Sequence, residues 1–119
     1  MTSRLLLPGE VLIVRTLLDR TYEPKWRALD LEALRVSDMN DGGMGSLLFC
    51  STKPERMYGR TLSEGWFKDD DGLPVQVAIN LDMDDEIFEL DSWKVDSSPR
   101  RRLPESAAEI VPDPSDLGF

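Results

Sequence analysis

The chain has 119 residues, with 14 Lys and Arg against 23 Asp and Glu, one Cys and no His, so its formal net charge is −9. Without His, the Ser-His-Asp and Cys-His pairs that activate a nucleophile are excluded. The single Cys excludes an intrachain disulfide and the usual zinc site of His and Cys ligands. Hydrophobic residues at 40% and charged residues at 31% are typical of one soluble domain.

Charge and hydropathy exclude two kinds of partner. Nucleic acid requires a basic surface, and the one basic cluster is Arg100–Arg102. No apolar run approaches the ~20 residues that cross a bilayer, and residues 1–8 lack the apolar core of a signal peptide. We therefore expect a cytoplasmic protein that binds neither nucleic acid nor membranes.

The clearest helix signal begins at Pro8, a residue that is tolerated in the first turn of a helix. Glu10 follows near the positive end of the helix dipole. Val11, Val14 and Leu18 then recur with helical spacing. The sequence therefore predicts a helix from residue 8 to residues 20–22, before Pro24.

The segment after Trp26 is predicted to be β. Residues 29–39 alternate in polarity but change phase at Ala33 and Leu34, which indicates a bulged strand or, alternatively, a short helix over residues 29–34. The glycine-rich residues 40–45 predict a tight turn. The apolar run 46–51 predicts a central strand that is buried on both faces.

Three further strands are predicted over residues 58–64, 73–81 and 86–95, with Asp-rich turns between them. The dipeptide Asp71-Gly72 is typical of a type I′ hairpin turn. Short connections favour antiparallel pairing of neighbours. The predicted fold class is α+β, with an N-terminal helix packed on a four- to five-strand antiparallel meander sheet.

The domain is expected to span residues 1–104. Pro104, Pro112 and Pro114 prevent long regular elements after this point. Residues 105–119 are therefore predicted to form a C-terminal tail that is flexible or becomes ordered on contact.

No segment carries a complete motif for catalysis, a cofactor or a metal. Asp41–Ser46 lacks the Lys-Ser/Thr of a phosphate-binding loop, and the Asp-rich turns lack EF-hand spacing. The glycines indicate a tight turn or, alternatively, a close approach to a ligand or partner backbone. Cys50 is interpreted as a small buried hydrophobic residue.

A candidate interaction surface lies on the last strand and the turns. In that strand Phe88, Leu90 and Ser92 are predicted on one face, and the opposite face combines an aromatic side chain with flanking charge, as is common in binding patches. Trp93 packed under the tail is the alternative. The candidate residues are Asp41, Gly42, Gly43, Asp71, Glu89, Asp91, Trp93 and Lys94.

Three segments together resemble a family of small, uncharacterised bacterial proteins. They are the turn from Asp41 to Leu47, the turn Asp69–Gly72 and the strand Phe88–Asp96, which match a DGGMGS-type turn and an ELDxWKxD strand. The resemblance extends from Arg4 to Pro104 and implies no established activity. By analogy with small acidic bacterial proteins of similar layout, it suggests an immunity-like role.

The leading hypothesis is a non-enzymatic domain whose acidic surface binds a protein partner, such as a basic protein. The acidic residues gather at 69–71, 82–86 and 89–91, which gives the charge a predicted location. The alternative is a small-ligand or metal-dependent activity at clustered carboxylates, which requires Asp41, Asp71, Glu89 and Asp91 to converge within ~5–8 Å. A homodimer paired through an edge strand is a third hypothesis.

Overall fold

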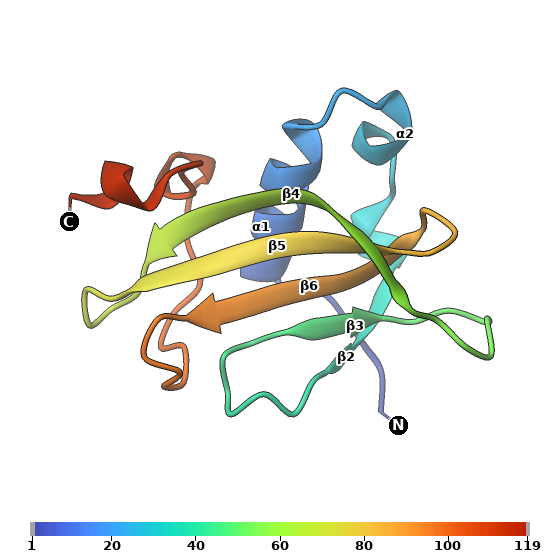
Figure 1. Cartoon of the computed structure of the whole chain (residues 1–119), viewed down its shortest axis with the longest axis horizontal. Coiled ribbons are helices and arrows are strands. Elements are labelled where there is room, and N and C mark those ends of the chain that lie inside the picture. The colour runs from blue at the N-terminus through green and yellow to red at the C-terminus, as the bar shows by residue number, and fades with distance from the viewer. Residues whose placement is uncertain (1, 119) are drawn as a thin grey trace.

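The sheet of this protein has six antiparallel strands, in the order β1-β2-β3-β6-β5-β4 (Figure 1). The computed structural model describes residues 2–118. The strands are β1 (Arg4–Leu5), β2 (Arg35–Asp38), β3 (Leu47–Phe49), β4 (Tyr58–Lys68), β5 (Pro74–Asp82) and β6 (Ile87–Lys94). The α+β class and the meander, formed by β4, β5 and β6, are confirmed. The strand that the sequence analysis missed is β1, which is only two residues long.

Helix α1 (Pro8–Asp19) agrees with the predicted helix and buries Ile13, Val14, Leu17 and Leu18 completely. It is followed by the one-turn helix α2 (Pro24–Arg27). A 3-10 turn over Leu31–Ala33 explains why the polarity pattern changes phase at Ala33 and Leu34. The structure therefore agrees better with the short-helix alternative than with a bulged strand. None of the helices within residues 2–118 has the length and apolar character that crossing a bilayer requires.

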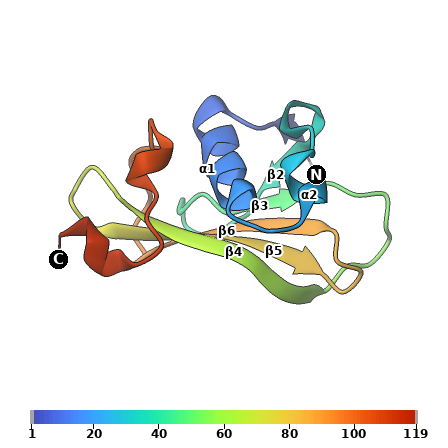
Figure 2. The same cartoon turned by 90° about the horizontal axis from the view of Figure 1, so that it is seen from above.

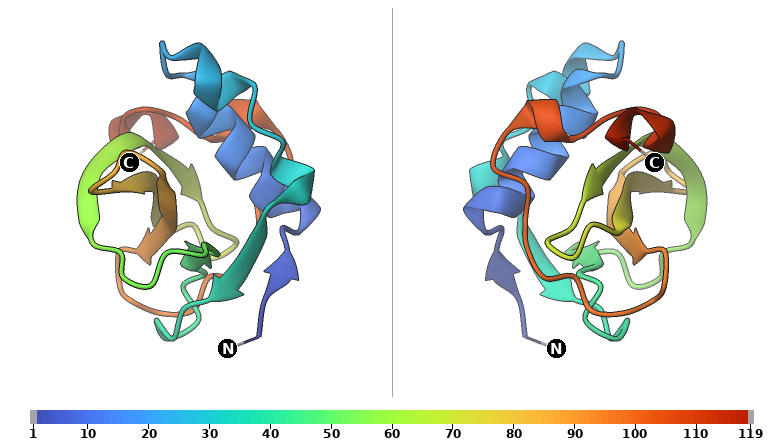
Figure 3. Two further views of the ribbon diagram at one scale, coloured as in Figure 1. Left: turned by 90° about the vertical axis from the view of Figure 1, so that its right-hand side faces the viewer. Right: turned by 90° about the vertical axis from the view of Figure 1, so that its left-hand side faces the viewer.

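The two α-helices lie on the same face of the sheet (Figure 2). The sheet curves around α1, with β1 and β2 on one side and β4 on the other (Figure 3). The inward side chains of β5, at positions 75, 77, 79 and 81, are fully buried together with Leu90 and Phe49. Among residues 2–118 no α-helix lies on the opposite face of the sheet, and we call this face the open side.

A β-bulge changes which side chains of β6 reach the open side. The register of β5 and β6 shifts between Asn80, which pairs with Glu89, and Leu81, which pairs with Ile87. The extra residue is Phe88. Phe88 was predicted to share a face with Leu90, but it lines a groove together with Glu89. A bulge places two successive residues on one face, which a strict alternation cannot anticipate.

The turn between β4 and β5 differs in type from the prediction. A type I′ turn needs positive φ at both central residues, but only Gly72 of the pair Asp71-Gly72 has one, at 84°. The hairpin closes through hydrogen bonds from Asp69 N to Leu73 O and from Gly72 N to Asp69 O. The hairpin position was thus correct and its type I′ assignment was wrong.

Residues 105–118 return to the sheet. They form 3-10 turns at Ala107–Glu109 and Pro114–Leu117, and Ile110 between them is buried in the core. Val111 exchanges two backbone hydrogen bonds of 2.8 Å with Trp66 of β4. The segment after residue 104 therefore contributes to the core and covers part of the β4 edge.

Candidate functional site

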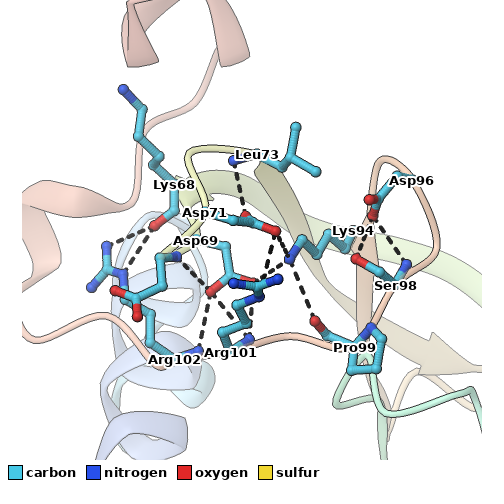
Figure 4. A network of polar contacts seen from close by, with 11 residues as sticks. Lys68, Asp69, Asp71, Leu73, Lys94, Asp96, Ser98, Pro99, Arg101 and Arg102 are labelled. Atoms are coloured by element: carbon cyan, nitrogen blue, oxygen red, sulfur yellow. Dashed lines mark hydrogen bonds and ion pairs between the residues drawn. The ribbon is translucent and has the colours of Figure 1, made fainter.

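A buried ion-pair cluster lies where β6 ends beside the β4–β5 hairpin (Figure 4). The Lys94 Nζ atom is 2.9 Å from Asp69 Oδ2 and 2.6 Å from Asp71 Oδ2. The side chains of Lys94 and Asp69 have no exposed surface. Lys94 was predicted to belong to an interaction surface, and this prediction is wrong because it points into the protein with Leu90 and Ser92.

Hydrogen bonds keep the Asp69 carboxylate ionised. It accepts backbone N–H groups from Asp70, Arg101 and Arg102 in addition to the Lys94 ammonium. Burial raises the pKa of Asp69, but these donors outweigh burial and hold the pKa below its usual range. The cluster connects Arg101 and Arg102, which follow β6, to the β4–β5 hairpin. Asp69 is buried within it and is not available at the surface.

Residues 99–100 of this chain pack against the glycine-rich turn. A Cβ atom on Gly45 would lie 2.3 Å from Arg100 Nη1, and one on Gly43 would lie 3.2 Å from Pro99 Cβ. The Arg100 N–H donates to Gly43 O at 3.0 Å. Asp41 closes the turn by accepting N–H groups from Met44 and Ser46. The tight-turn interpretation agrees with the positive φ of Gly42, Gly43 and Gly45, at 76°, 85° and 96°. The close approach is made by this chain's own residues 99–100 and not by a ligand or partner.

Asp82 organises a second set of ion pairs, at the β5–β6 turn. Its carboxylate lies 2.7 Å from Lys53 Nζ and 2.9 Å from Arg56 Nε, and it accepts backbone N–H groups from Asp84 and Glu86. Burial raises the pKa of Asp82, but these contacts outweigh it and hold that pKa well below its usual range. The second acidic cluster of the sequence is therefore largely neutralised by this chain's own cations.

The third acidic cluster behaves differently, because it lies on the open side of the sheet. Glu89 and Asp91 point there from β6, and Glu64 points there from β4. Ala78 of β5 pairs with both Asp91 and Glu64, so these two carboxylates stand two strands apart, about 10 Å. Within residues 2–118 none of the three forms an ion pair with a Lys or Arg.

Trp93 extends this patch along β6. Its side chain is 41% exposed, which is high for a residue of this size, so it is not packed under the C-terminal segment. Gln76 pairs with Trp93 across the strands and donates a hydrogen bond to Glu64. We call Glu64, Gln76, Glu89, Asp91 and Trp93 the acidic face.

A groove of about 600 Å³ adjoins the acidic face at Glu89. Its lining combines apolar side chains, including Leu48 and Phe88, with Lys53 and Arg56. Cys50 also lines it and is exposed, with its Sγ atom 3.8 Å from Ser37 Oγ. The prediction that Cys50 is buried was wrong, because Cys50 follows the last residue of β3 and lies on the open side.

The structure thus divides the candidate residues into three places. Glu89, Asp91 and Trp93 lie together on the acidic face. Asp71 and Lys94 belong to the buried cluster on the other side of β6. Asp41, Gly42 and Gly43 lie in the glycine-rich turn. The Ser46 hydroxyl connects this turn to the acidic face by donating a hydrogen bond of 3.3 Å to Asp91.

The residue that sequence reasoning missed is Glu64, because only the strand register places it opposite Ala78. The alternative site of Asp41, Asp71, Glu89 and Asp91 is not formed, because Asp71 pairs with Lys94 on the side of β6 opposite to Asp91. Within residues 2–118 no three His, Cys, Asp or Glu side chains are grouped so that they would hold a metal ion.

Comparison with known proteins identifies one family. The family model described as Domain of unknown function (DUF6984) matches residues 3–104, and this match confirms the resemblance carried by the turn and strand motifs. No curated protein and no solved structure matches the chain.

Proposed function

We propose that the chain, which belongs to the DUF6984 family, is a non-enzymatic interaction domain whose acidic face binds a basic protein partner. The observation that carries this proposal is the contrast between paired and unpaired carboxylates. Asp69 and Asp82 are matched by Lys94, Lys53 and Arg56. The carboxylates of the acidic face have no such cation within residues 2–118 and stand beside the half-exposed Trp93.

Unpaired carboxylates about 10 Å apart repel one another, so a cation that approaches them is attracted by all of them. Trp93 adds a large apolar contact surface of the type that anchors protein interfaces. A partner with Lys or Arg opposite the acidic face would gain both contacts. Electrostatic attraction of this kind raises association rates and selects partners.

A second copy of this chain fits the acidic face poorly. Two copies related by a two-fold axis would place the same surface against itself. Glu64, Glu89 and Asp91 would then meet their own counterparts, and like charges across an interface are unfavourable. The edge of β4, the other candidate for self-association, contains two register shifts and is bonded to Val111. We therefore favour a different protein as partner.

The proposed location is the cytoplasm, since the one Cys is a free thiol and a reducing compartment preserves it. An immunity-like role, in which the domain neutralises a basic toxin, is the specific form of the proposal. It rests on analogy with small acidic bacterial proteins and on the sign of the charge.

The experiment is a capture from bacterial lysate at two salt concentrations, about 50 mM and about 500 mM. Immobilised wild-type protein and a Trp93→Ala variant are compared. We expect a protein that wild type retains at low salt, releases at high salt and that Trp93→Ala retains less well. Retention that neither salt nor this substitution changes would contradict the proposal.

A further inference from the structure

We infer that the groove beside Glu89 receives an arginine side chain of the protein partner, together with an apolar neighbour in the partner's sequence. This inference rests on the proposed function and specifies the chemistry of its partner. It is carried by the lining of the groove, by the hydrogen bonds of its cations and by the free carboxylate at its wall.

The groove offers apolar contact. Leu48 and Phe88 are half-buried, and Met39 is 39% exposed. Its volume of about 600 Å³ lies within the range of about 300–1,000 Å³ found for ligand sites, so it has room for more than one side chain. An apolar stem or side chain would remove this surface from water, which is favourable.

The two cations of the groove are already paired with carboxylates of this chain. Lys53 Nζ lies 2.7 Å from Asp82, 3.1 Å from Asp84 and 3.0 Å from Glu86, which matches the three protons of an ammonium. Its charge is thus outnumbered by carboxylates.

Arg56 is held equally firmly. Its Nε donates to Asp82, its Nη1 donates to Phe49 O at 2.8 Å, and its Nη2 donates to Ile87 O. The guanidinium carbon also lies 4.9 Å from the centre of the Phe88 ring. Arg56 therefore fixes the wall of the groove, and three of its five N–H donors are used by acceptors of this chain.

Glu89 is the charged group of the groove that has no cation. Its Oε1 accepts a hydrogen bond of 3.4 Å from Asn80 Nδ2, and Oε2 accepts none among the described residues. Lys53 and Arg56 are paired with Asp82, Asp84 and Glu86, which lie outside the lining, so Glu89 is left as the unpaired charge of the groove. The charge balance therefore favours a positively charged occupant over a neutral or anionic one.

Arginine meets these conditions better than lysine. Its planar guanidinium can bind a carboxylate with two parallel hydrogen bonds, and its plane stacks on aromatic rings. Its three-carbon stem can pack on Leu48 while the head reaches Glu89. Arginine is also the charged residue most enriched at the centres of protein interfaces.

The test titrates the full chain with three capped peptides, Ac-Ala-Arg-Leu-NH2 and its versions with citrulline or Glu in place of Arg. Citrulline keeps the shape of arginine without the charge. Backbone amide chemical shifts from NMR report where each peptide binds. We expect saturable shifts at Leu48, Cys50 and Glu89 with the arginine peptide, and about tenfold weaker binding of the citrulline peptide, since one charge-assisted contact is lost.

Two variants locate the effect. Glu89→Gln should remove the preference for arginine over citrulline. Glu32→Gln, the matched change at an exposed position outside both the groove and the acidic face, should leave the preference intact. The inference is overturned if no groove amide shifts at millimolar peptide, if the Glu peptide binds as well as the arginine peptide, or if Glu89→Gln keeps the preference.

These outcomes are separable from the proposed function. Peptides that fail to bind the groove, alongside a captured partner that depends on Trp93, would remove the arginine site and leave the acidic face as an interaction surface. Arginine-selective binding in the groove without any salt-sensitive protein partner would support the site and contradict the proposed function.

Discussion

The Lys94 Nζ atom lies 2.9 Å from Asp69 Oδ2, and neither side chain is exposed to solvent. The contact joins the end of β6 to the hairpin between β4 and β5. Because an unpaired buried charge is costly, each of the two side chains requires the other. The Asp-rich turn of the sequence therefore serves the fold, and in the proposed function the partner is recognised by the carboxylates of the acidic face.

Removing the Asp69 charge should destabilise the protein strongly. Asp69→Asn leaves Lys94 buried with Asp71 alone, and breaking a buried pair typically costs about 3–5 kcal/mol. The neighbouring Asp70 is exposed and has no ion pair with the described residues, so Asp70→Asn should cost less than about 0.5 kcal/mol. Urea unfolding at neutral pH measures both, and equal losses would contradict the structural role of the cluster.

Stability should fall in acid through Asp82. Its pKa is lowered in the folded protein, so it contributes stability above its unfolded pKa of about 3.9. That contribution is lost as the pH falls through the lower, folded value. We expect the wild-type free energy of unfolding to decline from about pH 4 downward. Asp82→Asn should be less stable at pH 7 and show a shallower decline, and identical slopes in urea titrations would contradict this account.

The segment after residue 104 should contribute measurably to the core. Ile110 is fully buried, and its Cγ2 atom would lie 2.8 Å from a Cβ added to Gly65. Ile110→Ala should therefore cost about 2–5 kcal/mol. Leu117→Ala, at a half-exposed position of the same segment, should cost much less. Thermal unfolding distinguishes them, and a negligible effect of Ile110→Ala would show that the segment is not part of the fold.

The glycines of the turn should differ in a way that depends on Arg100. Gly42 has φ of 76° and open space around it, so Gly42→Ala should cost about 1–2 kcal/mol for the left-handed backbone. Gly45→Ala adds a clash with the Arg100 guanidinium and should cost more. In an Arg100→Ala background the two costs should become similar. A double-mutant cycle measures this, and a difference that persists without Arg100 would contradict the contact.

Helix α1 and the three meander strands could be predicted because periodicity and turn residues report them locally. Lys94 was assigned to the interaction surface although it is in phase with the buried Leu90, because its partner Asp69 lies in the distant turn between β4 and β5. The bulge at Phe88 and the position of Glu64 depend on strand register, which a single sequence does not reveal. Alternation along β6 therefore placed Glu89, Asp91 and Trp93 on one face, whereas the neighbours of these residues on other strands could not be predicted.

The most direct test of the acidic face compares two variants of equal charge. One carries Glu64→Gln, Glu89→Gln and Asp91→Asn. The other removes three exposed carboxylates elsewhere, through Glu32→Gln, Glu55→Gln and Asp70→Asn. The measurement is the amount of the salt-sensitive protein partner that each variant retains relative to wild type. We expect the first variant to retain at least about tenfold less of this partner than wild type, and the second to retain nearly as much as wild type. Equal retention by the two variants would contradict a binding role for the acidic face.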